Sequence, residues 1–132
     1  MSFSSLRNVA LASLVALGSM ALVGCGPDYD HTDITGVKAS DLGGDVNKGA
    51  ITVPEGLIVK AHIVSWNDDK KEMALSIRSR NPDIVEVAGV VNDHDYAFLG
   101  HAIGHTDIEF AADDKVVLTV GADVTPQPDV TP

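Results

Sequence analysis

Hydrophobic and polar residues alternate with a period of two in several short runs of this chain. The clearest run covers residues 57–66 and places Leu57, Val59, Ala61 and Ile63 on one face. Successive side chains of a β-strand point to opposite faces of its sheet, so this alternation predicts a half-buried strand.

Further short runs rich in β-branched and aromatic residues lie on both sides of this strand. They cover residues 34–39, 50–53, 73–78, 84–87, 96–99, 106–111 and 115–124. Turn-forming residues separate the runs, for example Asn81-Pro82-Asp83, where proline fixes φ and asparagine bonds back to the backbone. The spacing predicts an all-β fold, an immunoglobulin-like β-sandwich of seven or eight strands over residues 34–124. Residues 125–132 contain three prolines and predict a disordered, Pro-rich tail.

The N-terminal segment has a different pattern, because every residue from Val9 to Val23 is apolar, glycine or serine. Arg7 precedes this run, and residues 1–24 contain no acidic side chain. A short positive region, an apolar core and small residues at a cleavage site are typical of a helical secretory signal peptide. The alternative is an uncleaved membrane-spanning helix, but the run is near the lower length limit and no Lys/Arg cluster follows it.

The four residues Leu22-Val23-Gly24-Cys25 at the end of this run resemble the lipobox of bacterial lipoproteins, and Cys25 is the only cysteine. The resemblance implies cleavage between Gly24 and Cys25 and a covalent lipid, such as palmitate, on Cys25. Residues 1–24 are then a signal peptide and residues 25–33 a lipidated tether. Each buried acyl methylene contributes about 0.8 kcal/mol, so two or three chains hold a small domain on a membrane. Gly26, rather than Asp, follows the cysteine, which by the same resemblance implies the outer membrane.

Charge restricts the partners of the mature chain. Removal of residues 1–24 leaves 108 residues, enough for one domain with its own core. This part has eight basic and nineteen acidic residues, a formal net charge of −11. It therefore lacks the basic surface of a nucleic-acid-binding protein and is not expected to adsorb to anionic lipid head groups. The covalent lipid is the expected membrane link, and no cysteine remains for a disulfide.

A second resemblance lies in the body of the chain. Residues 79–87 (SRNPDIVEV) resemble the S-x-N-P-x-I-V-x-V segment of bacterial immunoglobulin-like domains, in particular the group 2 type of intimin- and invasin-like surface proteins. Residues 102–108 (AIGHTDI) are similar to the A-x-G-x-T-x-I signature of that family, and 116–120 (VVLTV) to its last strand. In this pattern Ile84 and Val87 enter the core and Gly104 takes a backbone conformation that other residues avoid. The family has spacer or adhesive domains without catalytic residues.

The chemistry most strongly suggested by side-chain type is metal binding. His94, His101 and His105, with Asp95, lie within a short stretch and form a candidate metal site. Zinc or copper requires three or four converging ligands, and neither an HExxH nor a CxxC motif is present. The alternative is that these are solvated histidines on loops and strand surfaces.

Calcium binding and catalysis have weaker support. Acidic pairs occur at Asp68-Asp69, at Asp93 and Asp95, and at Asp113-Asp114, but no D-x-D-x-D-G loop is present. No G-x-S-x-G elbow surrounds any serine, so an enzyme is not predicted.

Two hypotheses for the function follow from the sequence. The first is a lipid-anchored, non-catalytic envelope protein, with a structural role or an unknown protein or glycan partner. The second is a periplasmic metal-binding lipoprotein that uses the His/Asp cluster.

Overall fold

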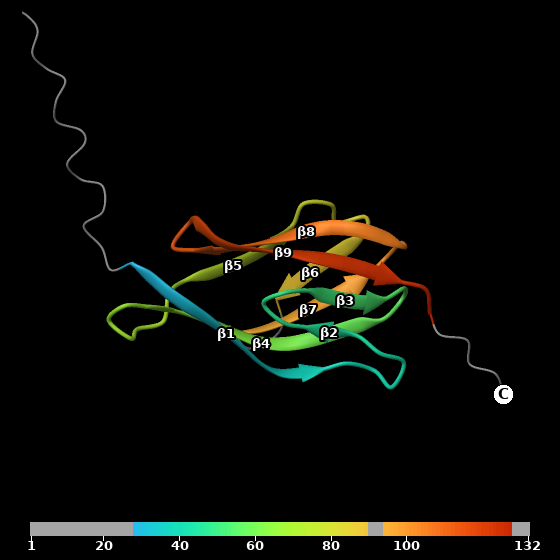
Figure 1. Ribbon diagram of the computed structural model, residues 1–132, viewed down its shortest axis with the longest axis horizontal. Coiled ribbons are helices and arrows are strands. Elements are labelled where there is room, and N and C mark those ends of the chain that lie inside the picture. Colours follow the sequence, from blue (N-terminus) through green and yellow to red (C-terminus); the bar gives the residue numbers. More distant parts are fainter. Residues whose placement is uncertain (1–27, 90–93, 128–132) are drawn as a thin grey trace, which may run out of the picture.

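Nine strands form within residues 28–89 and 94–127, the parts of the chain that this computed structural model describes (Figure 1). In chain order they are β1 (Tyr29–Lys38), β2 (Asp45–Val46), β3 (Ile51–Pro54), β4 (Ile58–Asn67), β5 (Leu75–Ser79), β6 (Val85–Gly89), β7 (Asp95–Gly100), β8 (Gly104–Ala112) and β9 (Lys115–Thr125). The sequence predicts seven or eight strands, and β2, only two residues long, was not among them.

The strands form two sheets that pack face to face (Figure 1). One sheet has the order β1-β4-β7-β6 and the other β2-β3-β9-β8-β5, with β3 parallel to β9. Immunoglobulin sandwiches place strands A, B, E and D in one sheet and C, F and G in the other. Apart from β2 and β3, the chain follows this scheme, with β1, β4, β7 and β6 in the first sheet and β5, β8 and β9 in the second. The predicted immunoglobulin-like sandwich is therefore confirmed.

Alternating side chains of both sheets fill the core. In β4, Val59, Ala61 and Ile63 are buried while Lys60 and His62 are exposed, as the sequence predicts. The other core residues are Val46, Ile51, Val53, Val85, Phe98, Ile108, Phe110, Val120, Ala122 and Val124. Phe98 and Phe110 are the largest fully buried side chains. Burial of each large apolar side chain contributes roughly 1.5–3 kcal/mol, so this core is the main source of stability.

Strand β1 begins at Tyr29, inside the segment 25–33 that the sequence predicts to be a tether. It pairs antiparallel with β4, with Tyr29 opposite Asn67 and Thr32 opposite Ser65. The predicted boundary at residue 34 is therefore five residues too late. Residues 29–33 contain no aliphatic side chain, and it is pairing with a strand more than thirty residues away that orders them. The predicted signal peptide, residues 1–24, and residues 128–132 of the predicted tail lie outside the described residues.

The Asn81-Pro82-Asp83 turn is confirmed, since the backbone N–H of Asp83 donates to Asn81 Oδ1 at 3.2 Å. The side chains that follow agree with the prediction in part, because Ile84 and Val87 pack against the core but are not among its fully buried residues. Val85 is fully buried, whereas Ile84 and Val87 are only partly buried. Ile84 precedes β6, and residues three apart cannot share one face of a strand, so Val85 and Val87 form the inward pair.

Gly104, at the start of β8, has the special conformation that the sequence predicts. Its φ angle is +156°, and a Cβ atom at this position would lie 3.3 Å from Ile84 Cδ1. A side chain here would press on the residue that leads into β6. The glycine thus lets the β7–β8 loop pass close to the Asn81 turn.

Candidate functional site

The two ends of the sandwich differ in their connection to the N-terminus. At one end, here called the N-terminal end, β1 begins beside the last residues of β4, and the Asp68 N–H donates to the Asp28 carbonyl at 2.9 Å. The β8–β9 turn at Asp113-Asp114 lies at the same end, because the Asp113 N–H donates to the Ala74 carbonyl just before β5. Any anchor attached before Tyr29 therefore joins the domain at this end (Figure 1).

The opposite end, here called the distal end, contains the start of β4, the end of β7 and the start of β8. The Gly56 N–H donates to the Gly100 carbonyl at 2.8 Å and fixes these segments together. Among the described residues, four large hydrophobic side chains are exposed, and three lie at or near this end: Val37, Ile58 and Ile103. Ile103, in the β7–β8 loop, is 56% exposed and the most accessible of them. The fourth, Val116, lies at the N-terminal end.

The structure does not bring the four candidate metal ligands together. His94, just before β7, lies 3.2 Å from Glu72 Oε2 through its Nε2 atom, and Asp95 accepts a hydrogen bond from His62. His101, beyond the other end of β7, pairs with Glu86 at 2.6 Å. His105 is in β8, in the second sheet. His94 and His101 are close in sequence, but they lie beyond opposite ends of β7, so the length of this strand separates them.

No group of three His, Cys, Asp or Glu side chains within residues 28–89 and 94–127 could hold a metal ion. Of the acidic pairs considered for calcium, Asp113 accepts a hydrogen bond from the Ala74 N–H, at 3.1 Å, and forms part of a tight turn with Asp114. Asp93, like Gly24 and Cys25, lies outside the described residues. The two metal hypotheses therefore have no geometric support in the described parts of the sandwich.

Each of the five histidines instead has a carboxylate neighbour. Besides the pairs above, His31 Nδ1 lies 2.6 Å from Asp30 Oδ2, and His105 Nδ1 lies 2.8 Å from Asp123 Oδ1 on β9. The hydrogen bond to Asp123 raises the pKa of His105 above its ordinary value of 6.5, against a smaller effect of desolvation. Two of these pairs join different strands, His62–Asp95 across β4 and β7 and His105–Asp123 across β8 and β9, so they could not be read from the sequence without the register.

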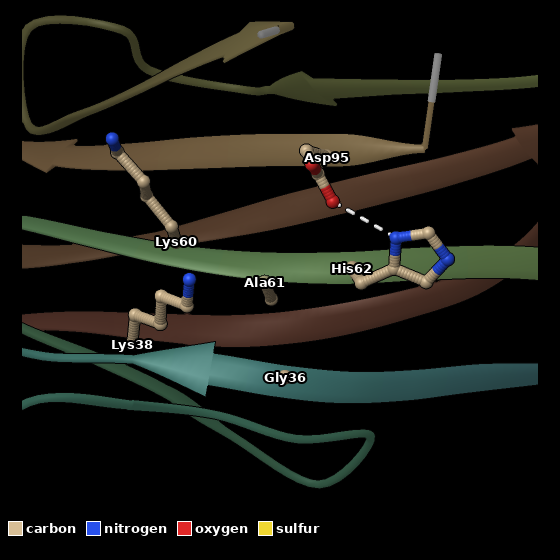
Figure 2. A pocket seen from close by; sticks show the side chains of 6 residues that line it. All are labelled: Gly36, Lys38, Lys60, Ala61, His62 and Asp95. Carbon is tan, nitrogen blue, oxygen red and sulfur yellow. Dashed lines mark hydrogen bonds and ion pairs between the residues drawn. The ribbon is translucent and has the colours of Figure 1, made fainter. Parts of the chain in front are cut away.

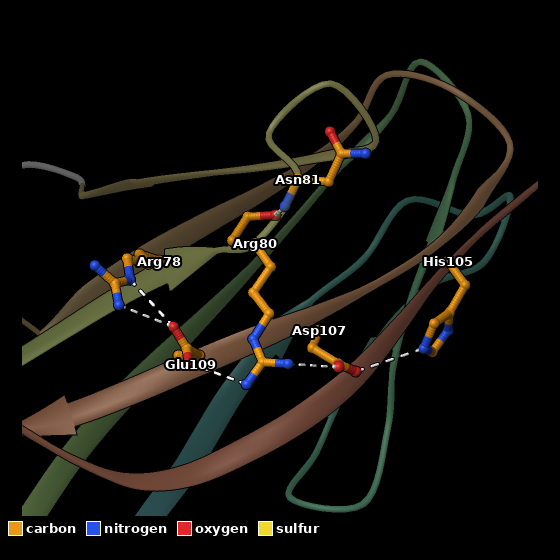
Figure 3. A network of polar contacts seen from close by, with 7 residues as sticks. Arg78, Arg80, Asn81, His105, Asp107 and Glu109 are labelled. Atoms are coloured by element: carbon orange, nitrogen blue, oxygen red, sulfur yellow. Dashed lines mark hydrogen bonds and ion pairs between the residues drawn. The ribbon is translucent and has the colours of Figure 1, made fainter.

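Charged side chains of β5, of Arg80 just after β5, and of β8 form a network on the outer face of the second sheet (Figure 3). Arg78 lies opposite Glu109 and donates to its Oε1 atom at 3.0 Å. Arg80 donates to Glu109 Oε2 at 3.2 Å and to Asp107 Oδ2 at 3.3 Å. Hydrogen bonds from Arg78, and then from Arg80, hold the pKa of Glu109 below its ordinary value of 4.5. These residues fasten the edge strand β5 to the sheet.

The hydroxyl groups of Ser65 and Ser79 take part in structural hydrogen bonds. Ser65 is fully buried, and its Oγ atom lies 2.8 Å from Thr32 Oγ1. The Ser79 Oγ atom accepts a hydrogen bond from the Asn81 N–H and serves the turn. Within the described parts of the chain, neither serine is hydrogen-bonded to a histidine, and both have structural partners. The described residues also contain no helix long and apolar enough to cross a membrane.

Comparison with known proteins supports the fold. No family model and no curated protein matches this chain. Solved structures of the S-layer protein SbsC are similar. Its domains 4 and 5 superpose with a TM-score of 0.52 at 14% identity, covering 76% of this chain and 54% of that one. Its domains 5–6 superpose with a TM-score of 0.55 at 16% identity, covering 80% and 48%.

A longer SbsC structure, domains 1–6, has a TM-score of 0.56 at 15% identity and covers 80% of this chain but 14% of that one. The chain therefore spans about half, or less, of the structures that it resembles. At this level of identity the likeness establishes the all-β sandwich and nothing more specific.

Proposed function

We propose that this protein is a lipid-anchored, non-catalytic component of a bacterial envelope, with one immunoglobulin-like domain that has a structural or partner-binding role. The lipobox-like segment ending at Cys25 supports the anchor. The sandwich fold and its likeness to domains of an S-layer protein support a structural role in the envelope. The resemblance of residues 79–87 to bacterial immunoglobulin-like domains points the same way.

The observation that carries the proposal is the short connection between the lipobox and the sandwich. Strand β1 begins at Tyr29, only four residues after Cys25. Four residues span at most about 14 Å even when fully extended. A lipid on Cys25 therefore holds the N-terminal end of the sandwich close to the membrane surface, and the domain has little freedom to tumble away from it.

The same connection directs the distal end away from the membrane. Strand β4 runs for ten residues between the two ends, which corresponds to about 30 Å at the usual rise of a β-strand. The exposed Ile103 and Ile58 side chains are thus presented to the space beyond the lipid head groups. We place the contact with a protein or glycan at this end because three of the four exposed large apolar side chains of the described residues lie at or near it.

Trp66 makes this orientation measurable, because it is the only tryptophan. It stands opposite His31 in β1, and its Nε1–H donates to Asp33 Oδ2 at 3.0 Å. In vesicles with dansyl-labelled lipid head groups, the anchored protein should show strong energy transfer from Trp66. A Trp66→Phe/Ile103→Trp double variant should show weak transfer, because its indole lies at the distal end. Equal transfer from both positions would contradict the proposed orientation.

Partner binding is tested at the distal end by replacing Ile103 with aspartate. In cells that carry the anchored protein, chemical cross-linking should yield a discrete adduct that Ile103→Asp removes. Val116→Asp is the matched control, because Val116 is a similarly exposed apolar residue at the N-terminal end. If both variants keep the adduct, the contact does not involve the distal surface.

A further inference from the structure

Two lysines lie side by side on the outer face of the β1-β4-β7-β6 sheet, toward its distal end. Lys38 and Lys60 are directly opposite partners in the β1–β4 ladder, and both are exposed (Figure 2). Like charges in opposite positions of a ladder repel each other. Within residues 28–89 and 94–127 neither lysine forms an ion pair, although the chain as a whole has a net charge of −10.

Among the described residues of the sheet, no acidic side chain is paired with either lysine. On the other side of β4, the residue opposite Lys60 in β7 is Ala97. The nearest acidic residue of that strand, Asp95, lies opposite His62 and accepts its hydrogen bond at 2.8 Å. Figure 2 shows the Asp95 carboxylate directed toward the His62 ring, while the two lysine side chains lie at the other side of the depression.

A hollow accompanies this excess of positive charge. Gly36 has a φ angle of +59°, and the ladder register shifts between Thr35 and Lys38, so β1 bulges at this point. Because Gly36 has no side chain, the surface beside His62 is open, and a depression of about 210 Å³ forms there. Its lining residues are Gly36, Lys38, Lys60, Ala61, His62 and Asp95.

We propose that this depression, here called the lysine site, binds a phosphate group. Two ammonium groups that no carboxylate of residues 28–89 and 94–127 neutralises are matched by one dianion, and a phosphate monoester carries about two negative charges near neutral pH. Charge-assisted hydrogen bonds from two exposed lysines correspond to weak binding, with a Kd on the order of 1–10 mM. This site is independent of the proposed lipid anchor, since it rests on the sandwich alone.

The test is a titration followed by NMR, using the protein purified from its expressing cells in a non-ionic detergent. Inorganic phosphate, added at constant ionic strength, should shift the signals of Lys38, Lys60 and His62 in a saturable way. Lys38→Ala/Lys60→Ala should weaken this binding more than tenfold. The matched control is Lys115→Ala, which removes an exposed lysine at the start of β9 and should leave the affinity unchanged.

Asp95→Asn gives a change of the opposite sign. Loss of one negative charge at the edge of the site should tighten phosphate binding about two- to fivefold. Titration with dihexanoyl phosphatidic acid distinguishes the source of the group. Saturable shifts at the same three residues indicate that the site also accepts a lipid phosphate, and their absence indicates a water-soluble phosphate compound. Shifts that do not saturate, or that persist unchanged in the double lysine variant, would overturn the proposal.

Discussion

Thr32 and Ser65 face each other across strands β1 and β4, and their hydroxyl oxygens lie 2.8 Å apart although both side chains are fully buried. The Tyr29 hydroxyl lies 2.9 Å from the same Thr32 oxygen. This small polar cluster draws the first residues of β1 into the sandwich. It is the structural reason that the domain begins only a few residues after Cys25.

We expect Thr32→Val to destabilise the domain by about 1–3 kcal/mol, because the Ser65 hydroxyl would remain buried without a partner. Urea denaturation measures this free energy of unfolding. Thr32→Val/Ser65→Ala should recover part of the loss, since it removes both polar groups. Thr35→Val, at an exposed position of the same strand, serves as the control and should change stability by less than about 0.5 kcal/mol. A loss below this value for Thr32→Val would mean that the hydroxyl pair does not hold β1.

Gly44→Ala should destabilise the domain by about 1–3 kcal/mol. Gly44 has a φ angle of +117°, and a Cβ atom there would stand 2.5 Å from Val59 Cγ2 in the core. Both the backbone and the packing therefore oppose a side chain. Gly89→Ala is the control, because no atom lies within 4 Å of its added Cβ. Thermal unfolding of the two variants compares them, and similar melting temperatures would argue against the close approach of the β1–β2 connection to β4.

The His105–Asp123 pair should make stability depend on pH. Because folding raises the pKa of His105 above 6.5, the pair stabilises the fold fully below that pH, and the contribution is lost as pH rises through the folded pKa. Asp123→Asn should therefore destabilise the protein at acidic pH and have little effect at alkaline pH. NMR titration of the imidazole should give a pKa above 6.5 in the native chain and a lower one in the variant. Identical titration curves would exclude the pair.

Glu109 should produce the reverse dependence. Its folded pKa lies below 4.5, so its contribution is present above that pH and disappears as pH falls through the folded value. Glu109→Gln should be less stable than the native protein at neutral pH, with the difference shrinking in acid. Denaturation curves at several pH values measure it. Arg78→Gln should lessen this pH dependence, because the hydrogen bond from Arg78 is the largest cause of the lowered pKa.

The sequence predicts strands well where one face is apolar. The alternation in residues 57–66 identifies the buried face of β4, and the Asn81 turn places the start of β6. Prediction from the sequence fails where a segment becomes a strand only because it pairs with residues far away in the chain. Thr32 is polar and lies among charged residues, so only its pairing with Ser65 shows that residues 29–33 are a strand.

The candidate sites show the same limit. His94, His101 and His105 are close in sequence, but β7 and the two sheets separate them, and each has a different acidic neighbour. The lysine site shows the reverse case. Lys38 and Lys60 are far apart in sequence, and the register of β1 and β4 makes them neighbours. The residue types of a candidate site can be read from the sequence. Which of these residues lie close together depends on the pairing and register of the strands.

The most direct measurement of the proposed anchor is metabolic labelling with a fatty-acid analogue. Cells that make the native protein should yield a labelled, processed band in the membrane fraction. Cys25→Ser should lose the label and the processing, while Ser40→Ala, at an exposed serine beyond β1, should keep both. If Cys25→Ser retains the label, the processed size and the membrane location, the protein is not a lipoprotein anchored through Cys25.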